Sequence, residues 1–384
     1  MTVLRRNKPS HEENKTSYSL EEGSTAPLKT NDSYTVSRSW RHNSLIYYYS
    51  LACTFLVVFL VHDKKNTLRG CKETVLTKIT SPLASYIKRH EGSTPNSWSV
   101  VEWDNNPIRP EEDGKFSCEF VDFKSAESGK SAQICVHTSK DVVSGAIRRD
   151  QHWIDCDTLS KTWNVSVNKK SNKDTSSPVY IEVGANIGSC VMEMLLGTDA
   201  PIIAFEPHPM NLYNLKKTIS QLDKSYQDRV TLFPIGLGDL AGSSTIYAAN
   251  NNMGNSVVGK VIKDDENQQF DEKLQFTINV ERLDSLLSSN NLNVGLMKMD
   301  VQGFECKFLE GTGEEIMKKV DKIKFEFASH WLKNHDCTDL LPRLRNYGFD
   351  IFNADEGGTK FDGEPDYKDK DIIVDFIAKK TTMR

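Results

Sequence analysis

Short apolar runs alternate with segments of helical period through the second half of the chain. The runs are four to eight residues long and end in polar or glycine residues, which is typical of buried strands. Between them, residues 209–222 place Leu212, Leu215 and Ile219 on one helical face. Strands that alternate with helices predict a mostly parallel sheet with helices on both faces. We expect strands at residues 179–183, 202–205, 230–237, 294–299 and 322–327, and helices at residues 189–196, 209–222 and 340–347.

Two further strands, at residues 348–352 and 372–378, complete a predicted seven-stranded α/β sheet of the Rossmann-like type. Their direct succession indicates a β-β return, so the last strand should run antiparallel. Shorter β-like segments at residues 244–247 and 274–280 flank an Asn-rich loop at residues 250–256. Upstream, a hairpin is expected at residues 116–123 and 133–137, followed by a helix at residues 141–150.

The polarity of the chain divides it into five parts. The first 44 residues are polar and predict a disordered tail. Residues 45–61 carry no charge and predict one short transmembrane helix. Residues 62–99 predict a basic stalk, residues 179–384 the domain that contains the predicted α/β sheet, and residues 100–178 an N-terminal extension of that domain.

A short span suits the thinner membranes of the secretory pathway, so a single-pass protein of the Golgi or endoplasmic reticulum is expected. A lumenal domain would expose the sequon at Asn164, and lumenal glycans are rich in hydroxyl groups. The basic residues after the span favour a cytosolic domain instead. In that topology Asn14 and Asn31 would be the glycosylated sites, and the molecule on which the domain acts would be a lipid or a metabolite.

The composition of the chain limits the kinds of molecule that it is expected to bind. The net charge of the 384 residues is -5, and no basic stripe with interleaved aromatic residues indicates a nucleic-acid partner. The eight cysteines form no C-x-x-C motif, so no structural metal site is expected. Cys190 and Cys306 are predicted to be small buried thiols, whereas Cys118 and Cys135 would form a disulfide in a lumenal domain. The oligomeric state is not predicted.

The most informative stretch joins a strand to a glycine turn. Residues 179–188 read V-Y-I-E-V-G-A-N-I-G, and residues 202–207 end a second apolar run in Glu206 and Pro207. Glycines allow close backbone approach to a ligand, and an acid after the second strand is placed to accept hydrogen bonds from two ribose hydroxyls. The turn lacks the G-x-G-x-x-G pattern that binds a pyrophosphate, which favours S-adenosyl-L-methionine over NAD.

Four motifs in this order resemble the FkbM family of S-adenosylmethionine-dependent methyltransferases. They are E-V-G-A-N-I-G, A-F-E-P-H-P-x-N, R-L-D-S-L-L and K-M-D-V-Q-G-F-E, and the similarity extends over roughly residues 135–380. The resemblance implies a class I methyltransferase fold and, usually, methyl transfer to a hydroxyl oxygen. Gln302 stands where the family commonly has glutamate.

Candidate cofactor residues follow the strand ends. Glu182 and the turn of Gly184, Ala185, Asn186 and Gly188 are expected to hold the amino acid end of the cofactor, unless Glu182 only braces the turn. Glu206 with Pro207 is assigned to the ribose. The remaining candidates, assigned to the adenine, are Gly236, Leu237 and Asp239, the last being equally an ordinary turn residue.

Candidate catalytic residues lie after the fourth and fifth strands. Asp300 is the preferred group to orient or deprotonate an acceptor hydroxyl. Lys298 shares its strand face and is expected to pair with Asp300 or Glu326, a purely structural ion pair being the alternative. His330 is a second candidate base. The loop of residues 253–256 is expected to cover the pocket.

Two other classes remain as alternatives. Tyr213 and Lys217 have the spacing of the catalytic pair of an NAD-dependent short-chain oxidoreductase, although they lie on the helix after the second strand. A catalytically silent, membrane-anchored binding scaffold would keep the fold without the chemistry. The acceptor itself, whether a sugar, glycan, lipid or small metabolite, is not specified, because variable loops build such pockets.

Overall fold

The central sheet has seven strands, and its order follows the predicted alternation with helices. The computed structural model describes residues 83, 87, 98–104, 106–108, 116–169, 177–249, 252–259, 270–354, 358–365 and 372–381. In spatial order the strands are β12 (Phe349–Asn353), β13 (Ile373–Lys380), β11 (Lys322–Ala328), β10 (Val294–Met299), β3 (Val179–Val183), β4 (Ile202–Phe205) and β5 (Val230–Phe233).

Strands β11, β10, β3, β4 and β5 are parallel, and β13 pairs antiparallel with both β11 and β12. The expected mixed sheet with a final β-β return is therefore confirmed. The order of the strands changes direction between β3 and β10: β4 and β5 lie on one side of β3, and the later strands lie on the other. This switch point is where an open α/β sheet leaves room for a ligand.

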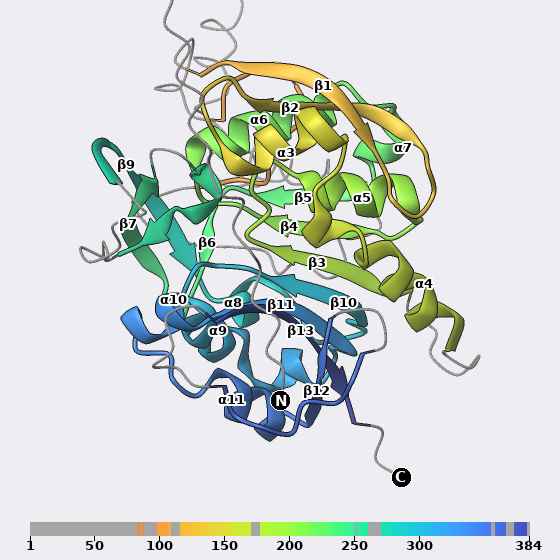
Figure 1. Ribbon diagram of the computed structural model, residues 1–384, viewed down its shortest axis with the longest axis vertical. Coiled ribbons are helices and arrows are strands. Elements are labelled where there is room, and N and C mark those ends of the chain that lie inside the picture. Colours follow the sequence, from red (N-terminus) through yellow and green to blue (C-terminus); the bar gives the residue numbers. More distant parts are fainter. Residues whose placement is uncertain are drawn as a thin grey trace, which may run out of the picture. The chain divides into compact units, whose positions relative to one another are not determined.

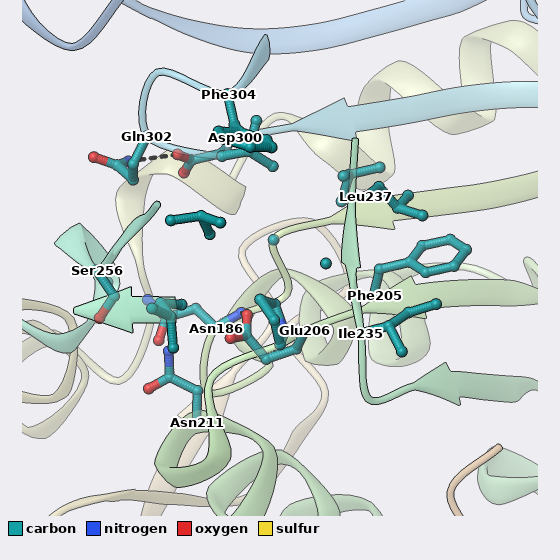
Figure 2. A pocket seen from close by; sticks show the side chains of 18 of the residues that line it. Asn186, Phe205, Glu206, Asn211, Ile235, Leu237, Ser256, Asp300, Gln302 and Phe304 are labelled. Atoms are coloured by element: carbon teal, nitrogen blue, oxygen red, sulfur yellow. Dashed lines mark hydrogen bonds between the residues drawn. The ribbon is translucent and has the colours of Figure 1, made fainter. Parts of the chain in front are cut away.

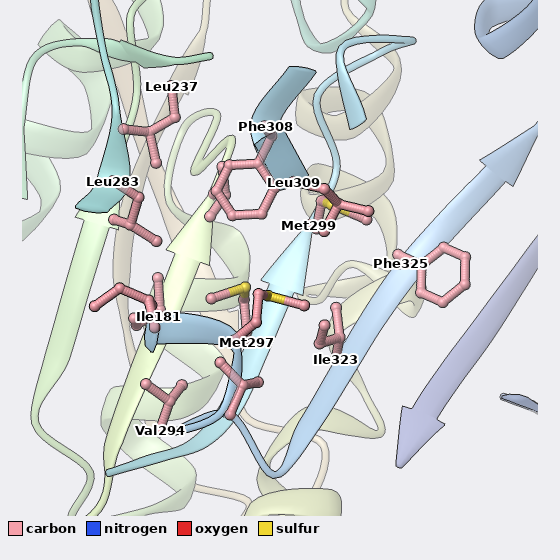
Figure 3. Close-up of a cluster of buried hydrophobic side chains, with 14 of the residues drawn as sticks. Ile181, Leu237, Leu283, Val294, Met297, Met299, Phe308, Leu309, Ile323 and Phe325 are labelled. Atoms are coloured by element: carbon pink, nitrogen blue, oxygen red, sulfur yellow. The ribbon is translucent and has the colours of Figure 1, made fainter. Parts of the chain in front are cut away.

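Helices cover both faces of the sheet (Figure 1). One face packs against α4 (Leu159–Lys169), α5 (Ser189–Gly197) and α6 (Pro209–Ser220), and the other packs against α8 (Leu283–Leu286), α9 (Glu305–Met317) and α11 (Leu340–Asn346). Figure 3 shows the second face, where Ile181, Met297 and Ile323 of neighbouring strands meet Phe308 and Leu309 of α9. Two shorter helices are α7 (Lys224–Gln227) and α10 (Ser329–Asn334).

A second, four-stranded sheet lies beside the pocket. Its order is β6 (Gly236–Leu237), β9 (Phe270–Glu281), β7 (Gly242–Ala249) and β8 (Val257–Val258), with the short helix η4 (Met253–Asn255) between β7 and β8. The single strand predicted at residues 230–237 is therefore wrong: Pro234 separates β5 from β6, which pairs with β9 instead. Proline has no N–H for a ladder, so it favours a break there.

The N-terminal extension packs on the same domain. It contains the hairpin of β1 (Cys118–Lys124) and β2 (Ser131–His137), then α3 (Val142–Asp150) and the short helix η3 (Ile154–Cys156). Asp141 caps α3 through its side chain. Leu83, Ile87 and Trp98, which the sequence assigned to a stalk, also pack against the core, so the packed domain includes these positions.

The cysteines differ from expectation. The six cysteines of the described ranges form three disulfides, Cys118–Cys135, Cys156–Cys190 and Cys306–Cys337. The prediction that Cys190 and Cys306 are free buried thiols is thus wrong. Their partners lie 34 and 31 residues away in sequence, and only the packing of η3 on α5 and of α9 beside α10 brings them together.

The membrane prediction is also corrected. No helix within the described ranges is long and apolar enough to cross a bilayer, so the single-pass Golgi or endoplasmic reticulum location is not upheld. The segment on which it rested, residues 45–61, lies outside the described residues, as does the tail of residues 1–44.

Two helical glycines give a matched test of how tightly α9 is packed. A Cβ on Gly311 would lie 1.8 Å from the carbonyl oxygen of Gly238, whereas a Cβ on Gly145 in α3 would meet no atom within 4 Å. We expect Gly311→Ala to lower the free energy of unfolding by about 2 kcal/mol or more, because backbone must move. Gly145→Ala should instead be neutral or stabilise by up to about 1 kcal/mol. Urea unfolding of both variants measures this, and equal effects would contradict the packing described for α9.

Candidate functional site

The turn after β3 is squeezed between two neighbouring strands. Gly184 has φ 84°, and a Cβ there would lie 2.0 Å from the carbonyl oxygen of Asp300. The N–H groups of Gly184 and Ala185 both donate to the carbonyl of Phe205, at 3.1 and 2.9 Å. Gly188 has φ 91° and faces the side chain of Leu215 on α6. The glycines of the motif therefore serve close approach between backbone segments, and they leave the turn open towards a pocket.

Glu206 follows β4 and braces this turn. Its Oε2 accepts from the Asn186 N–H at 2.7 Å, and its Oε1 accepts from the His208 N–H at 2.8 Å. The Asn211 side-chain amide forms a further hydrogen bond to the same carboxyl group. Only 4% of Glu206 is exposed, and burial raises its pKa to about 7 against the opposing effect of these hydrogen bonds.

A pocket of about 680 Å³, open to solvent, begins at this turn. Figure 2 shows Glu206, Asn186 and Asn211 on one side, Asp300 and Gln302 on another, and the apolar side chains of Phe205, Ile235 and Leu237 between strand ends. The pocket is thus lined by apolar side chains and by two separate acidic residues, Glu206 and Asp300.

The second acidic group lies at the end of β10. Asp300 accepts from the Lys298 Nζ at 3.2 Å and from the Gln302 Nε2 at 2.6 Å. Its side chain remains 30% exposed and lines the pocket. Gln302 adopts φ 52°, which directs its amide back towards Asp300. A glutamate here, as in the resembling family, would be unable to donate when ionised and would repel Asp300.

Lys298 lies between Asp300 at the pocket and the buried carboxyl group of Glu182. Its Nζ lies 3.4 Å from Glu182 Oε1 and 3.2 Å from Asp300 Oδ2. Burial alone would lower the pKa of Lys298, but the carboxylates of Asp300 and Glu182 raise it, so the ammonium stays charged. Glu182 also accepts from the Tyr180 hydroxyl, and burial raises the pKa of both groups.

The structure separates the predicted residues into two groups. The pocket is lined by seven of them, namely Gly184, Asn186, Glu206, Pro207, Gly236, Leu237 and Asp300. The other seven are not among its lining residues: Ala185, Gly188, Glu182, Asp239, Lys298, Glu326 and His330.

Among the non-lining residues, Glu182 contacts the side chains of Tyr180 and Lys298, which differ from the backbone N–H groups of the turn that a brace would contact. The Asp239 carbonyl accepts from Arg282. His330 lies on α10 with its ring against Trp331, at a centroid distance of 4.9 Å. Glu326 is half-buried on β11, and burial together with Asp300, Asp375 and Asp155 raises its pKa.

Sequence reasoning missed several lining residues. Asn211 belongs to the A-F-E-P-H-P-x-N motif, so its position was visible but its role was not. Ile246, Val280 and Phe304 come from elements that local periodicity does not relate to the pocket. The loop expected to cover the site does contribute, through Met253, Gly254 and Ser256.

The pair proposed for an oxidoreductase lies elsewhere. Tyr213 and Lys217 are both on α6, with the Lys217 ammonium 5.6 Å from the centre of the Tyr213 ring, and neither lines the pocket. The sheet order and the pocket instead define a doubly wound α/β domain with a pocket at the carboxyl ends of β3, β4 and β10.

Comparison with known proteins specifies the class further. Residues 182–351 match the model of the methyltransferase FkbM domain. The methyltransferase sdnD of Sordaria araneosa is 26% identical over 199 residues, which cover 46% of this chain and 75% of that protein.

Solved structures are more distantly similar. The precorrin-6y C5,15-methyltransferase of Geobacter metallireducens is 12% identical with a TM-score of 0.29, covering 59% of this chain and 89% of its own. A SAM-dependent O-methyltransferase of Thermotoga maritima is 9% identical with a TM-score of 0.27, covering 69% and 94%. Both TM-scores are low, so the fold rests on the strand order of the sheet.

The buried charges beneath the pocket give a stability prediction. Lys298→Met would leave Glu182, which is 1% exposed, without its counter-charge, and should lower the free energy of unfolding by about 3–5 kcal/mol. Lys318→Met, at a lysine whose side chain is 52% exposed beside Glu314 and Glu315, should leave the free energy of unfolding nearly unchanged.

Adding Glu182→Gln to Lys298→Met tests the pairing directly. The double variant should regain about 1 kcal/mol or more relative to Lys298→Met, since the unpaired buried charge is gone. Urea unfolding of wild type, Lys298→Met, Glu182→Gln and the double variant measures the coupling. Strictly additive losses would show that Glu182 and Lys298 do not interact.

Proposed function

We propose that this chain is an S-adenosyl-L-methionine-dependent methyltransferase that transfers a methyl group to a hydroxyl oxygen. The observation that carries the proposal is the pocket with Glu206 at the end of β4 and Asp300 at the end of β10, joined by an apolar wall. The match of residues 182–351 to a methyltransferase domain supports the same reaction class.

The residues of the pocket fit this cofactor. The apolar side chains of Phe205, Ile235 and Leu237 suit the adenine, and the carboxylate of Glu206 suits a ribose hydroxyl. A carboxylate has about four acceptor positions. Asn186, His208 and Asn211 already donate to Glu206, so we assign it one ribose hydrogen bond rather than the two expected from sequence.

The turn at Gly184 and Asn186 is assigned to the amino acid end of the cofactor. A side chain at residue 184 would fill this space and collide with Asp300, so the glycine keeps the cradle open. When bound, the cofactor supplies an electrophilic methyl group on a sulfonium. The protein must then place the acceptor oxygen and take up its proton.

Asp300 is assigned to the acceptor hydroxyl. Lys298 and Gln302 each donate one hydrogen bond to its carboxylate, and the exposed part of the group faces the pocket. These donors orient the carboxylate, which can accept the proton of the hydroxyl. His330 is not among the lining residues and is therefore the second candidate.

The acceptor class is proposed from the reaction alone. A hydroxyl of a sugar, glycan, lipid or small metabolite satisfies the chemistry. Incubation of the full chain with S-adenosyl-L-methionine and a panel of these acceptors, followed by mass spectrometry, identifies the methylated product. Binding of S-adenosylhomocysteine with no binding of NAD, measured by calorimetry, separates the proposal from the oxidoreductase alternative.

The pKa of Glu206 gives a pH prediction. Because the ionised carboxylate is the better acceptor and its pKa is about 7, affinity for S-adenosylhomocysteine should increase about tenfold from pH 6 to pH 8. Glu206→Gln should weaken binding by about 1.5–3 kcal/mol at pH 8 and should flatten the pH dependence. Calorimetry at several pH values measures both effects.

Glu305 provides the control for that experiment. It is a second buried carboxyl group whose pKa is raised to about 7 by burial, and its Oε1 accepts from the Val301 N–H beside the pocket. A pH slope that persists in Glu206→Gln but disappears in Glu305→Gln would remove Glu206 from the ribose assignment.

Asp300→Asn separates chemistry from binding. The amide keeps the size of the side chain but cannot accept a proton, so turnover should fall by about a hundredfold or more while affinity for S-adenosylhomocysteine changes little. Product formation with an acceptor found in the panel measures turnover. Loss of cofactor affinity in this variant would instead place Asp300 on the amino acid end of the cofactor, and unchanged turnover would make His330 the next base to test.

A further inference from the structure

Two buried polar side chains of the N-terminal extension hydrogen-bond to residues that line the pocket. His137, at the end of β2, is 2% exposed, and Asp141, the cap of α3, is 5% exposed. Both precede residue 182, where the match to the methyltransferase domain begins. Burying polar groups is costly unless they are hydrogen-bonded, so their partners indicate what they do.

His137 belongs to a chain of hydrogen bonds that ends at Glu206. Its Nε2 lies 2.9 Å from the Asn211 Oδ1, and the Asn211 side chain in turn bonds to Glu206. An ionised carboxylate only accepts, so Asn211 must present its NH₂ group to Glu206 and its oxygen to His137. His137 therefore donates through Nε2, and this fixes the orientation of the amide.

Asp141 holds the segment that covers the pocket. Its Oδ2 accepts from the N–H and the hydroxyl of Ser144, at 2.8 and 2.6 Å, which caps α3. Its Oδ1 accepts from the backbone N–H of Met253 at 2.9 Å. Within this segment the Ser256 hydroxyl donates to the Met253 carbonyl, and Met253 and Ser256 both line the pocket. One carboxylate thus joins α3 to the pocket cover.

The extension is fixed to the pocket by further contacts. The Cys135 N–H donates to the Thr218 hydroxyl at 2.9 Å, so β2 runs along α6, the helix that carries Asn211 (Figure 1). A disulfide joins Cys156 of η3 to Cys190, two residues after Gly188 of the cofactor turn. His137 and Asp141 are therefore presented from an anchored support.

We propose that His137 and Asp141 are positioning residues for the cofactor: His137 orients Asn211 towards Glu206, and Asp141 holds the cover at Met253–Asn255 over the pocket. The proposal rests on the assignment of this pocket to S-adenosyl-L-methionine. It gives the extension, which lies outside the matched domain, a direct part in cofactor affinity.

Matched variants test the two residues. Asp141→Ser keeps a hydroxyl that can cap α3 but is too short to reach Met253, and Asp122→Ser makes the same change at an exposed position of β1. His137→Ala removes the donor to Asn211, whereas His137→Gln restores one. We expect Asp141→Ser and His137→Ala to weaken S-adenosylhomocysteine binding about threefold to tenfold, with KM for the cofactor raised and kcat little changed. Asp122→Ser and His137→Gln should remain near wild type.

Hydrogen exchange on the full chain without ligand gives an independent measurement. The Met253 amide should exchange faster in Asp141→Ser than in wild type or Asp122→Ser, because its acceptor is gone. Unchanged exchange and unchanged affinity would overturn the role of Asp141, and equal affinities for His137→Ala and His137→Gln would overturn that of His137. Failure of wild type to bind S-adenosylhomocysteine would overturn the proposed function instead, while faster exchange would still support the contact between Asp141 and the cover.

Discussion

Two parallel strands end so close together that the residue after one of them must be glycine. A Cβ on Gly184 would lie 2.0 Å from the Asp300 carbonyl oxygen, and the same turn is bound to the end of β4 through Phe205. This contact sets the distance between the turn after β3 and the acid after β10. That spacing determines the shape of the pocket at the switch point of the sheet. It also fixes how far apart the two acidic groups lie.

The charged groups beneath the pocket also depend on close contacts between neighbouring strands. Lys298 has a carboxylate on either side, Glu182 in the core and Asp300 at the pocket, so one buried cation pairs with two acids. Buried ion pairs seldom add stability over apolar packing, yet breaking them is costly. Keeping Lys298 charged therefore supports the orientation of Asp300, and Gln302 adds a neutral donor without adding a third negative charge.

The residues that line the pocket all lie within the matched domain, but one of them, Asn211, is hydrogen-bonded to a residue that precedes the domain. The motif residue Glu206 has its hydrogen bonds arranged by Asn186, His208 and Asn211, and Asn211 in turn contacts His137 from the extension. Burial raises the pKa of Glu206 to about 7, so these donors decide how readily it acts as an acceptor. The extension is thus connected by hydrogen bonds to a group that sequence motifs assign to the core domain alone.

The sequence by itself determined the seven strands of the sheet, their alternation with helices, and the acids at the ends of β4 and β10, because apolar runs and glycine turns are local signals. It did not determine that Glu182 would turn away from the pocket to Lys298, or that the strand expected at residues 230–237 would divide between two sheets. Nor did it pair Cys156 with Cys190 or bring Asp141 to Met253, which are 112 residues apart. These outcomes depend on contacts between distant segments, and such contacts arise only when both faces of the sheet are packed.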